Sequence, residues 1–263
     1  MVVKPLRFGV IILFMFSGHL LAMCLATLVG LSLGAMGGGG SIITTPVLVY
    51  AAHVPPENAV GMSLVIVGVT SFLGAALHLR RGNVALEAGV LFSLTGMVAA
   101  FLGSTATHLL HRRTLMLLYA GVMVLVGLAM LRGGIARRRS KPRNVYQCLA
   151  AGFAVGLLTG FLGVGGGFLI VPALVLFAGL DTRVAAGTSL AVIAFNCLTG
   201  LLGQLRFVLM DWNLLFGFLA FAIAGMVIGS TLSTRLPETQ LRRMFAITVL
   251  VLGGAVGLTN LLT

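Results

Sequence analysis

Ten apolar segments follow one another along the chain, in two groups of five separated by a basic stretch. They occupy residues 8–34, 41–53, 59–79, 84–107, 114–132, 146–163, 167–180, 184–205, 211–233 and 239–262. An α-helix rises about 1.5 Å per residue, so about 20 residues are needed to cross a hydrocarbon core about 30 Å thick. Eight of the segments approach or exceed that length. This recurrence predicts an all-α integral membrane protein with eight full spans, or ten if the two short segments also cross.

The composition excludes the main soluble classes of protein. Hydrophobic residues make up 59% of the chain and charged residues 8%, whereas soluble domains have about 25% charged residues. The net charge of +12 comes from basic residues in the gaps between apolar segments, which is the positive-inside pattern rather than a nucleic-acid patch. Cys24, Cys148 and Cys197 are far apart and form no C-x-x-C motif, so we expect apolar thiols and neither a metal site nor a disulfide framework. No cofactor is expected.

The first segment resembles a signal peptide, because Lys4 and Arg7 precede it. Its apolar run continues to Leu33, which is too long for a cleaved leader, and Met23 is too bulky for the small residue before a lipoprotein cysteine. We therefore expect a retained first span. His19, midway along this span, should face protein or water, where it either relays a proton or bonds a neighbouring helix.

The two groups of segments are copies of one another. When the sequence is shifted by 126 residues, many glycines, prolines and arginines of the two halves align without a gap. The matched pairs include Gly30 and Gly156, Gly34 and Gly160, Pro46 and Pro172, Gly61 and Gly187, Gly74 and Gly200, Arg80 and Arg206, and Gly103 and Gly229. We expect one membrane domain over 1–263, with repeat one over 8–132, a cytoplasmic basic linker over 133–145 and repeat two over 146–263.

The second segment of each half is too short to cross a bilayer. Residues 41–53 and 167–180 would reach only about 20 Å as helices, and each follows a glycine cluster and has a proline in its first turns. We expect broken or re-entrant half-helices that face the protein interior, because free backbone groups are not tolerated against lipid. If these segments re-enter, each half has four spans and the repeats are parallel. If they cross, each half has five spans and the repeats are inverted. The basic residues fit both arrangements, and the short length favours the parallel one.

A glycine-rich motif marks each short segment. The copies are Gly34-x-x-Gly37-x-Gly39-Gly40-Ser41-x-Ile43-x-x-Pro46 and Gly160-x-x-Gly163-x-Gly165-Gly166-Gly167-x-Leu169-x-x-Pro172. Glycines let the backbone unwind or approach a ligand, and the helix that follows starts with unpaired N–H groups and the positive end of its dipole. Two such N-termini meeting at mid-membrane would form an anion site. The alternative is tight helix packing through glycines four residues apart.

The candidate binding residues combine these motifs with intramembrane polar side chains. Ser63 is matched by Ser189 in the repeat, and Thr70 is matched by Asn196. Hydroxyl groups in a span commonly bond the preceding turn, whereas a buried amide needs a partner, which makes Asn196 the most informative. The predicted substrate-binding residues are Gly37, Gly39, Gly40, Ser41, Thr44, Ser63, Thr70, Gly163, Gly165, Gly166, Gly167, Ser189 and Asn196.

The third segment of each half ends with two further polar residues. His78 and Arg80 are matched by Gln204 and Arg206. The arginines could attract an anion at the mouth of a pathway or simply extend to the headgroup region. His78 and Gln204 could line the same path.

The paired glycine motif, the Gly-x-Ser-Leu sequences at 61–64 and 187–190, the duplication and the basic linker resemble the sulfite exporter TauE/SafE family of membrane permeases. The similarity covers the chain from about Leu28 to Gly257. The resemblance implies a transporter of small anions, often sulfur-containing, such as sulfite or organosulfonates. Ser41 stands where the second copy has Gly167, so the two half-sites differ chemically.

We therefore expect a multi-pass secondary transporter in the cytoplasmic membrane, whose partners are a small anion and the lipid bilayer. The chain has no nucleotide-binding loop, so an ion gradient or the anion gradient should supply the energy; a role for protons and assembly with a second copy stay open. A non-transporting membrane scaffold is the alternative function. An intramembrane hydrolase acting through Ser63 or Ser189 is a third hypothesis. An enzyme is not expected, because the sequence has no H-E-x-x-H, G-x-S-x-G or C-x-x-C motif.

Overall fold

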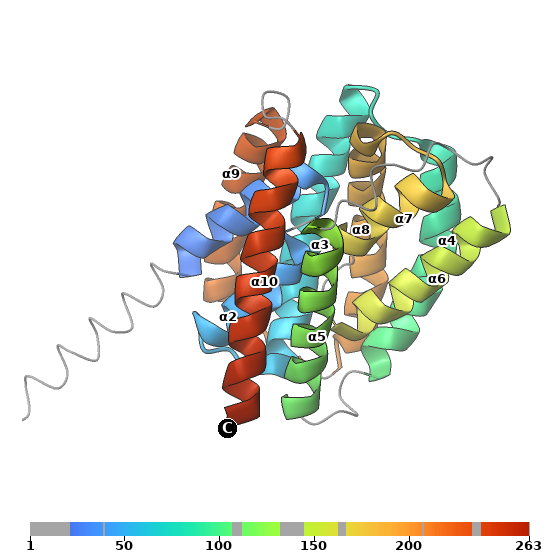
Figure 1. Ribbon diagram of the computed structural model, residues 1–263. Coiled ribbons are helices and arrows are strands. Elements are labelled where there is room, and N and C mark those ends of the chain that lie inside the picture. Colours follow the sequence, from blue (N-terminus) through green and yellow to red (C-terminus); the bar gives the residue numbers. More distant parts are fainter. Residues whose placement is uncertain are drawn as a thin grey trace, which may run out of the picture.

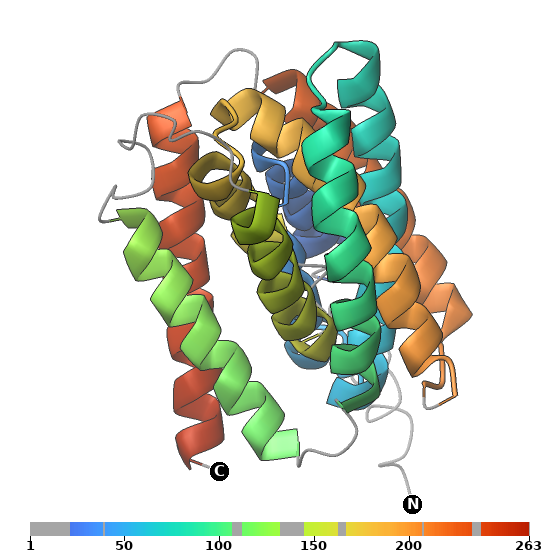
Figure 2. The ribbon, with the colours of Figure 1, turned by 90° about the vertical axis from the view of Figure 1, so that its right-hand side faces the viewer.

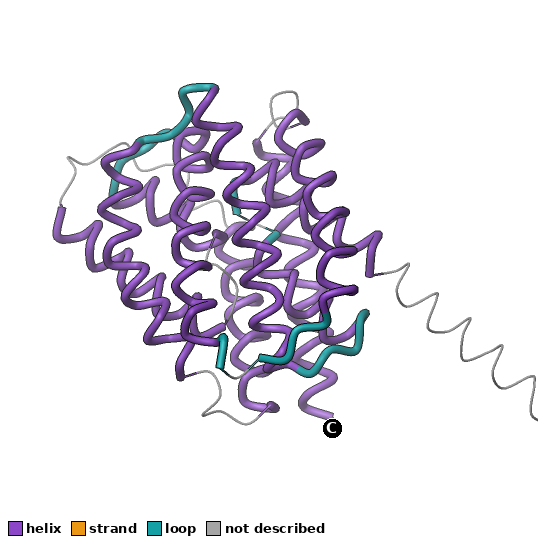
Figure 3. The backbone as a smooth tube through the Cα atoms, turned by 180° about the vertical axis from the view of Figure 1, so that it is seen from behind, coloured by secondary structure: helices purple, strands orange, loops and turns teal. Residues whose placement is uncertain are grey.

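The computed structural model describes residues 22–38, 40–106, 112–131, 145–162, 167–206, 208–232 and 238–262. Its helices are Ala22–Met36, α2 (Ser41–Tyr50), α3 (Pro56–Arg80), α4 (Leu86–Ala106), α5 (Arg112–Leu131), α6 (Val145–Leu162), α7 (Gly167–Phe177), α8 (Thr182–Gln204), α9 (Trp212–Leu232) and α10 (Glu238–Leu262). All regular structure in these ranges is helical (Figures 1 and 3), which confirms the predicted all-α class. His19, Gly39, Gly163, Gly165, Gly166 and most of the linker lie outside the described residues.

Several of the described helices have the length and apolar character of membrane spans. Four are long and apolar enough to cross a bilayer, namely α3, Leu86–Thr105 of α4, Arg183–Gln204 of α8, and α9. The shorter apolar helices are Ala22–Met36, α2, Met116–Leu125 of α5 and Val145–Phe161 of α6. Large hydrophobic side chains such as Phe72, Leu94 and Phe216 are exposed on these helices, as expected for surfaces that face lipid. The prediction of a multi-pass helical membrane protein is therefore confirmed, while eight full spans stay a prediction.

The matched helices α3 and α8 pack against each other in opposite directions. Gly74 of α3 lies against Leu190 of α8, and Gly200 of α8 lies against Leu64 of α3. The four-span arrangement predicted that matched helices would run parallel, and for this pair that expectation is wrong. Segment length could not reveal the direction, because it depends on how α2 returns the chain.

The direction of α2 follows from the helices on either side of it. The helix Ala22–Met36 runs parallel to α9, since Gly30 lies against Ala222 and Gly34 against Met226. The helix α3 also runs parallel to α9, because its end bonds the end of α9 through Arg81 and its start bonds the residue Leu209 just before α9. The helix Ala22–Met36 therefore runs in the same direction as α3. Because α3 begins at the opposite end from the one toward which that helix runs, α2 must return the chain to the end where α3 begins.

The two halves exchange packing partners. The helix Ala22–Met36 packs on α9 of the second half, and α6 packs on α4 of the first half. In the second contact Gly156 lies against Gly96, and Gly160 lies against Ala100. The 126-residue shift relates these two contacts to the first one, in which Gly30 lies against Ala222 and Gly34 against Met226. The matched pair α5 and α10 lies side by side at one edge of the molecule (Figure 2).

Two apolar clusters form the core, and each draws on both halves. The first contains Val60 and Met116 together with Phe218, and the second contains Phe92 together with Leu190. Phe92 and Phe218 are matched by the 126-residue shift, and both are almost fully buried. The hydrophobic core therefore runs across the two halves without a boundary between them.

Candidate functional site

The two short helices begin at one place in the molecule. Gly38 comes three residues before α2, and Gly167 is the first residue of α7. Their backbones are so close that a Cβ atom on either glycine would overlap the backbone of the other. Gly37 and Gly38 have φ angles of 70° and 146°, in the left-handed region that favours glycine. Gly38 of the first break and Gly167 at the start of α7 therefore meet across the two halves.

The junction of the two breaks is tightly packed. A Cβ atom at Gly37 would overlap Ala186 of α8, and one at Gly40 would overlap the carbonyl oxygen of Val29. Among the described residues of the junction, these glycines leave no space for a methyl group. Close packing, the alternative that the sequence left open, is therefore sufficient to explain why Gly37, Gly38, Gly40 and Gly167 are glycines.

Some of the first-turn amides of α2 already have partners. The Ser41 N–H donates to the carbonyl of Gly38 at 3.2 Å, and the Ile43 N–H donates to the carbonyl of Gly40 at 3.1 Å. The Gly40 N-cap provides no side-chain bond. The expectation of unpaired N–H groups at the α2 N-terminus is wrong for these two amides, because carbonyls of the glycine turn accept their hydrogen bonds.

Most of the predicted hydroxyl donors bond the preceding turn. Ser41 Oγ donates to Gly38 O at 2.7 Å, Thr44 Oγ1 to Gly40 O at 3.3 Å and Thr70 Oγ1 to Ile66 O at 2.7 Å. All three side chains are buried. This is the local bonding that commonly satisfies hydroxyl groups inside spans, so a ligand would have to replace a carbonyl as the acceptor.

Ser63 and Ser189 occupy matched positions but have different partners. Each donates to a carbonyl three residues earlier, Ser63 to Val60 at 2.8 Å and Ser189 to Ala186 at 2.7 Å. Ser63 Oγ also accepts a hydrogen bond of 3.0 Å from Thr45 of its own half, whereas Ser189 Oγ reaches the carbonyl of Gly37 in the other half. Ser189 therefore links α8 to the described glycine break of the opposite half.

Asn196 lies seven residues after Ser189, on the same face of α8. The side chain is 2% exposed, and its Oδ1 has no hydrogen-bond partner. It lies against α4, where a Cβ atom at Gly96 would be 2.8 Å from Oδ1. The structure thus places Asn196 two helical turns from the Ser189 contact with the break, with an amide oxygen whose burial is unfavourable unless it is paired.

The predicted pathway residues do not gather at one mouth. His78 is 7% exposed and packs against Gly187, and neither ring nitrogen has a partner. Gln204 is buried, and its Nε2 donates to the carbonyl of Ser104 at 3.0 Å. Arg80 and Arg206 are exposed. Because α3 and α8 are antiparallel, His78 with Arg80 and Gln204 with Arg206 lie at opposite ends of the molecule.

A profile of the sulfite exporter TauE/SafE family matches residues 22–256 of the chain. The chain belongs to the TauE/SafE family. It is 38% identical over 231 residues to a probable membrane transporter protein of Xylella fastidiosa (strain Temecula1 / ATCC 700964), covering 85% of this chain and 88% of that relative. It is 28% identical over 232 residues to the probable membrane transporter protein YdhB of Bacillus subtilis (strain 168), covering 86% and 95%. No solved structure matches the chain.

Membership of the TauE/SafE family confirms the resemblance inferred from the glycine motifs. The names of these relatives also support the broader prediction of a membrane transporter. Within the part of this TauE/SafE chain that the structure describes, no group of three His, Cys, Asp or Glu side chains is placed to hold a metal ion.

Two polar residues of this TauE/SafE protein were not among the predicted site residues. Arg81 Nη1 donates to the carbonyl of Ser230 at 3.1 Å and joins the end of α3 to the end of α9. Its matched position is Phe207, so the repeat gave no signal for it. Ser71 is fully buried on α3, and its hydroxyl oxygen has no partner. Its position one residue after Thr70 in a span was the only available signal.

Proposed function

We propose that the protein is a secondary transporter that moves a small sulfur-bearing anion, such as sulfite or an organosulfonate, across the cytoplasmic membrane. The observation that carries this proposal is the meeting of Gly38 with Gly167, because it brings together the N-termini of two short helices from different halves. The positive ends of two helix dipoles favour an anion at such a place. The name of the family is the support for sulfite as the substrate class.

Neutral donors suit this substrate better than buried cations would. Among the described residues, the buried polar side chains are those of Ser, Thr, Asn, Gln and His, and none is Lys or Arg. A sulfite or sulfonate group presents several acceptor oxygens, which backbone N–H and hydroxyl groups can bind without holding the anion too strongly for release. The unpartnered atoms of Ser71, His78 and Asn196 mark places where a passing ligand or water would gain a hydrogen bond.

The tight junction indicates how such a transporter must work. An anion enters only after the first break separates from Gly167 and Ala186. During this movement the Ser189 hydroxyl exchanges the Gly37 carbonyl for an anion oxygen. Separation toward one end and then toward the other gives alternating access around one central site.

Inverted repeats would give the transport path one opening on each side of the membrane. We propose that repeat one (8–132) and repeat two (146–263) are related by a pseudo-two-fold axis in the membrane plane. The antiparallel packing of α3 with α8 and the matched glycine contacts on α4 and α9 support this arrangement. Opposite exits then lie near His78 and Gln204. Energy comes from an ion gradient or from the gradient of the anion.

Flux into proteoliposomes tests the function directly. Purified protein is reconstituted, and uptake of labelled sulfite, sulfonates, sulfate and carboxylates is measured with and without a pH gradient. We expect saturable uptake of at least one sulfur-bearing anion and none in protein-free vesicles. The same anion should raise the melting temperature in detergent, because a ligand that binds only the folded state stabilises it.

A scaffold protein would give a different result. If folded protein neither transports any anion of this panel nor gains melting temperature from one, the proposed function is wrong. Uptake of carboxylates alone would retain an anion transporter and remove the sulfur-bearing substrate. The variant Gly121→Ala is a suitable positive control, since nothing lies within 4 Å of a Cβ atom added there.

A further inference from the structure

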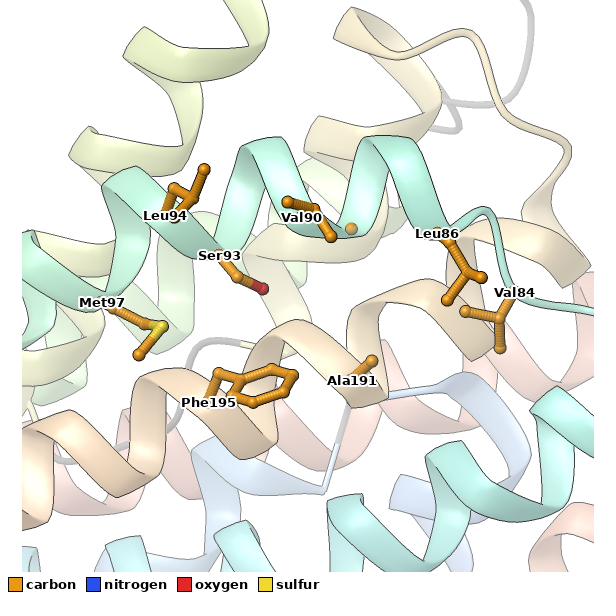
Figure 4. A pocket seen from close by; sticks show the side chains of 9 residues that line it. Val84, Leu86, Val90, Ser93, Leu94, Met97, Ala191 and Phe195 are labelled. Carbon is orange, nitrogen blue, oxygen red and sulfur yellow. The ribbon is translucent and has the colours of Figure 1, made fainter.

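A shallow apolar groove runs along the outer surface between α4 and α8. It has a volume of about 220 Å³ and is lined by Val84, Leu86, Gly89, Val90, Ser93, Leu94, Met97, Ala191 and Phe195. Figure 4 shows Ser93 and Met97 of α4 pointing toward Phe195 of α8. Leu86, Val90, Leu94 and Phe195 are all exposed. The groove therefore opens toward the region where lipid surrounds the protein.

Small residues of α4 create this groove. At the positions that match Gly89 and Ser93 in the second half, α9 has Leu215 and Leu219, and Leu215 is 1% exposed. A leucine in place of either small residue would occupy the space between the helices. The groove is thus a feature of the first half that the 126-residue duplication does not repeat in sequence.

The length of the groove matches one leaflet of a bilayer. It begins at Val84 and Leu86, where α4 starts, and ends at Met97, at the middle of α4. The helix rises about 16 Å from Leu86 to Met97, and half of the hydrocarbon core is about 15 Å. An acyl chain lying in the groove would therefore extend from the headgroup level to the bilayer centre.

Positive charge surrounds the outer end of the groove. Arg80 and Arg81 end α3 just before the loop that reaches Val84, and both are exposed. Arg183, also exposed, lies one turn before Gly187 and Thr188, which contact that same loop. These three arginines outnumber the exposed carboxylates near them, Glu87 at the start of α4 and Asp181 at the start of α8.

The basic linker leads to the same end of the molecule. Gly152 of α6 lies against Phe92 of α4 and Gly160 lies against Ala100, so α4 and α6 run parallel and begin at the same end. The linker directly precedes α6 in sequence. By the positive-inside rule this is the cytoplasmic side, whose leaflet carries anionic lipids.

We infer that the groove binds one anionic phospholipid, with an acyl chain between α4 and α8 and its phosphate beside Arg80 and Arg183. A zwitterionic lipid with the same chains would fill the groove equally well but would gain less from the arginines. Each basic residue near an anionic surface favours binding about fivefold. The lipid would hold α4 against α8 at the end where α3 also terminates.

Thermal unfolding of purified, delipidated protein tests this inference. The protein is titrated with phosphatidylglycerol or with phosphatidylcholine of identical chains, and with free glycerol phosphate. We expect phosphatidylglycerol to raise the melting temperature at concentrations at least about fivefold lower than phosphatidylcholine. Free glycerol phosphate should have no effect, because it cannot occupy the apolar groove.

Variants separate the two parts of the site. Ser93→Leu fills the groove and should abolish the response to phosphatidylglycerol. The control is Ala220→Leu, which adds a leucine at an exposed position of α9 outside the groove and should leave the response unchanged. Arg80→Gln combined with Arg183→Gln should reduce the response to that of phosphatidylcholine, and Arg206→Gln should not. If Ser93→Leu does not fold, Val90→Phe, at a 55% exposed position, provides the same test.

Three results would overturn the inference. The first is equal stabilisation of the wild-type protein by both lipids. The second is an undiminished phosphatidylglycerol response when the groove is filled. The third is stabilisation by glycerol phosphate as large as that by the lipid, which would indicate a phosphate site without a chain site.

Discussion

The central helices α3 and α8 are matched in sequence, yet their polar side chains have different roles. Thr70 of α3 bonds its own preceding turn, whereas the matched Asn196 of α8 has an amide oxygen without a described partner. The unbonded His78 of α3 is matched by Gln204 of α8, which is bonded to α4. By contrast, the glycines that let the helices approach have matched contacts in both halves. The packing of this molecule follows the duplication, and its polar chemistry does not.

This difference favours one central site over two equivalent ones. The described break of the first half is contacted by a serine of the second half. Each prediction below tests whether the symmetric packing and the asymmetric chemistry are separate properties.

The largest expected effect comes from breaking the contact between the breaks. Gly38→Ala should lower the free energy of unfolding by about 2–6 kcal/mol, because it adds both a steric overlap and a strained φ angle. Gly167→Ala should be less damaging, since its φ is not positive and the matched residue Ser41 already carries a side chain. The measurement is thermal unfolding in detergent. Gly121→Ala should be neutral or slightly stabilising, and equal stability of the Gly38 and Gly121 variants would refute the close contact.

Opposite changes in stability are expected at His78 and Gln204. His78→Leu removes two buried nitrogens without partners and should raise the free energy of unfolding by about 1 kcal/mol. Gln204→Leu removes an interhelical hydrogen bond and should lower it by about 1 kcal/mol. Chemical or thermal unfolding of the two variants measures the difference. Equal destabilisation of both variants would contradict the claim that His78 lacks hydrogen-bond partners while Gln204 has one.

Transport should distinguish Ser189 from Ser63. Ser189→Ala should reduce anion flux about tenfold, because a hydrogen bond to a charged ligand is worth about 1.5–3 kcal/mol. Ser63→Ala is the matched comparison, and a smaller loss of flux there would show that the contact of Ser189 with Gly37 accounts for the effect. Both are measured in proteoliposomes at equal protein density. A greater loss of flux in the Ser63 variant would indicate that the anion binds beside Ser63 rather than beside Ser189, which contradicts the proposed site.

The smallest effect is expected at the two exposed arginines. Arg80→Cys and Arg206→Cys should each leave the melting temperature nearly unchanged, because surface substitutions are usually within about 0.5 kcal/mol. With the exposed Cys24 replaced by Ala, a membrane-impermeant thiol reagent should label them from opposite faces of the membrane. Labelling of both from one face would exclude inverted repeats.

Much of the fold could be predicted from apolar length and glycine spacing. The predicted segment 59–79 became Pro56–Arg80, and 211–233 became Trp212–Leu232. The short segment 167–180 became Gly167–Phe177. These boundaries were predictable because hydropathy falls where the chain leaves the lipid and because proline and glycine end or break helices.

Helix direction and the facing of side chains could not be predicted. A span that is apolar on every side has no polar face from which to infer its neighbours. Asn196 was expected near the breaks, but the sequence did not show that Gly96 of α4 would be its neighbour. Glycine spacing predicted that Gly30 and Gly156 would allow close contact and could not say with which helix. The candidate site could therefore be predicted as a place in the sequence, and its hydrogen bonds could not.

The exchanged packing of the first helices has a consequence for biosynthesis. Gly30 packs on Ala222, a residue that is translated 192 positions later. At about 5–20 residues per second, the ribosome reaches that partner about 10–40 s after making Gly30. The first helix must therefore wait in the translocon or the bilayer with its glycine face uncovered. The nascent chain cannot finish one half and then the other, and a truncation at the linker would leave two fragments that each lack a neighbour.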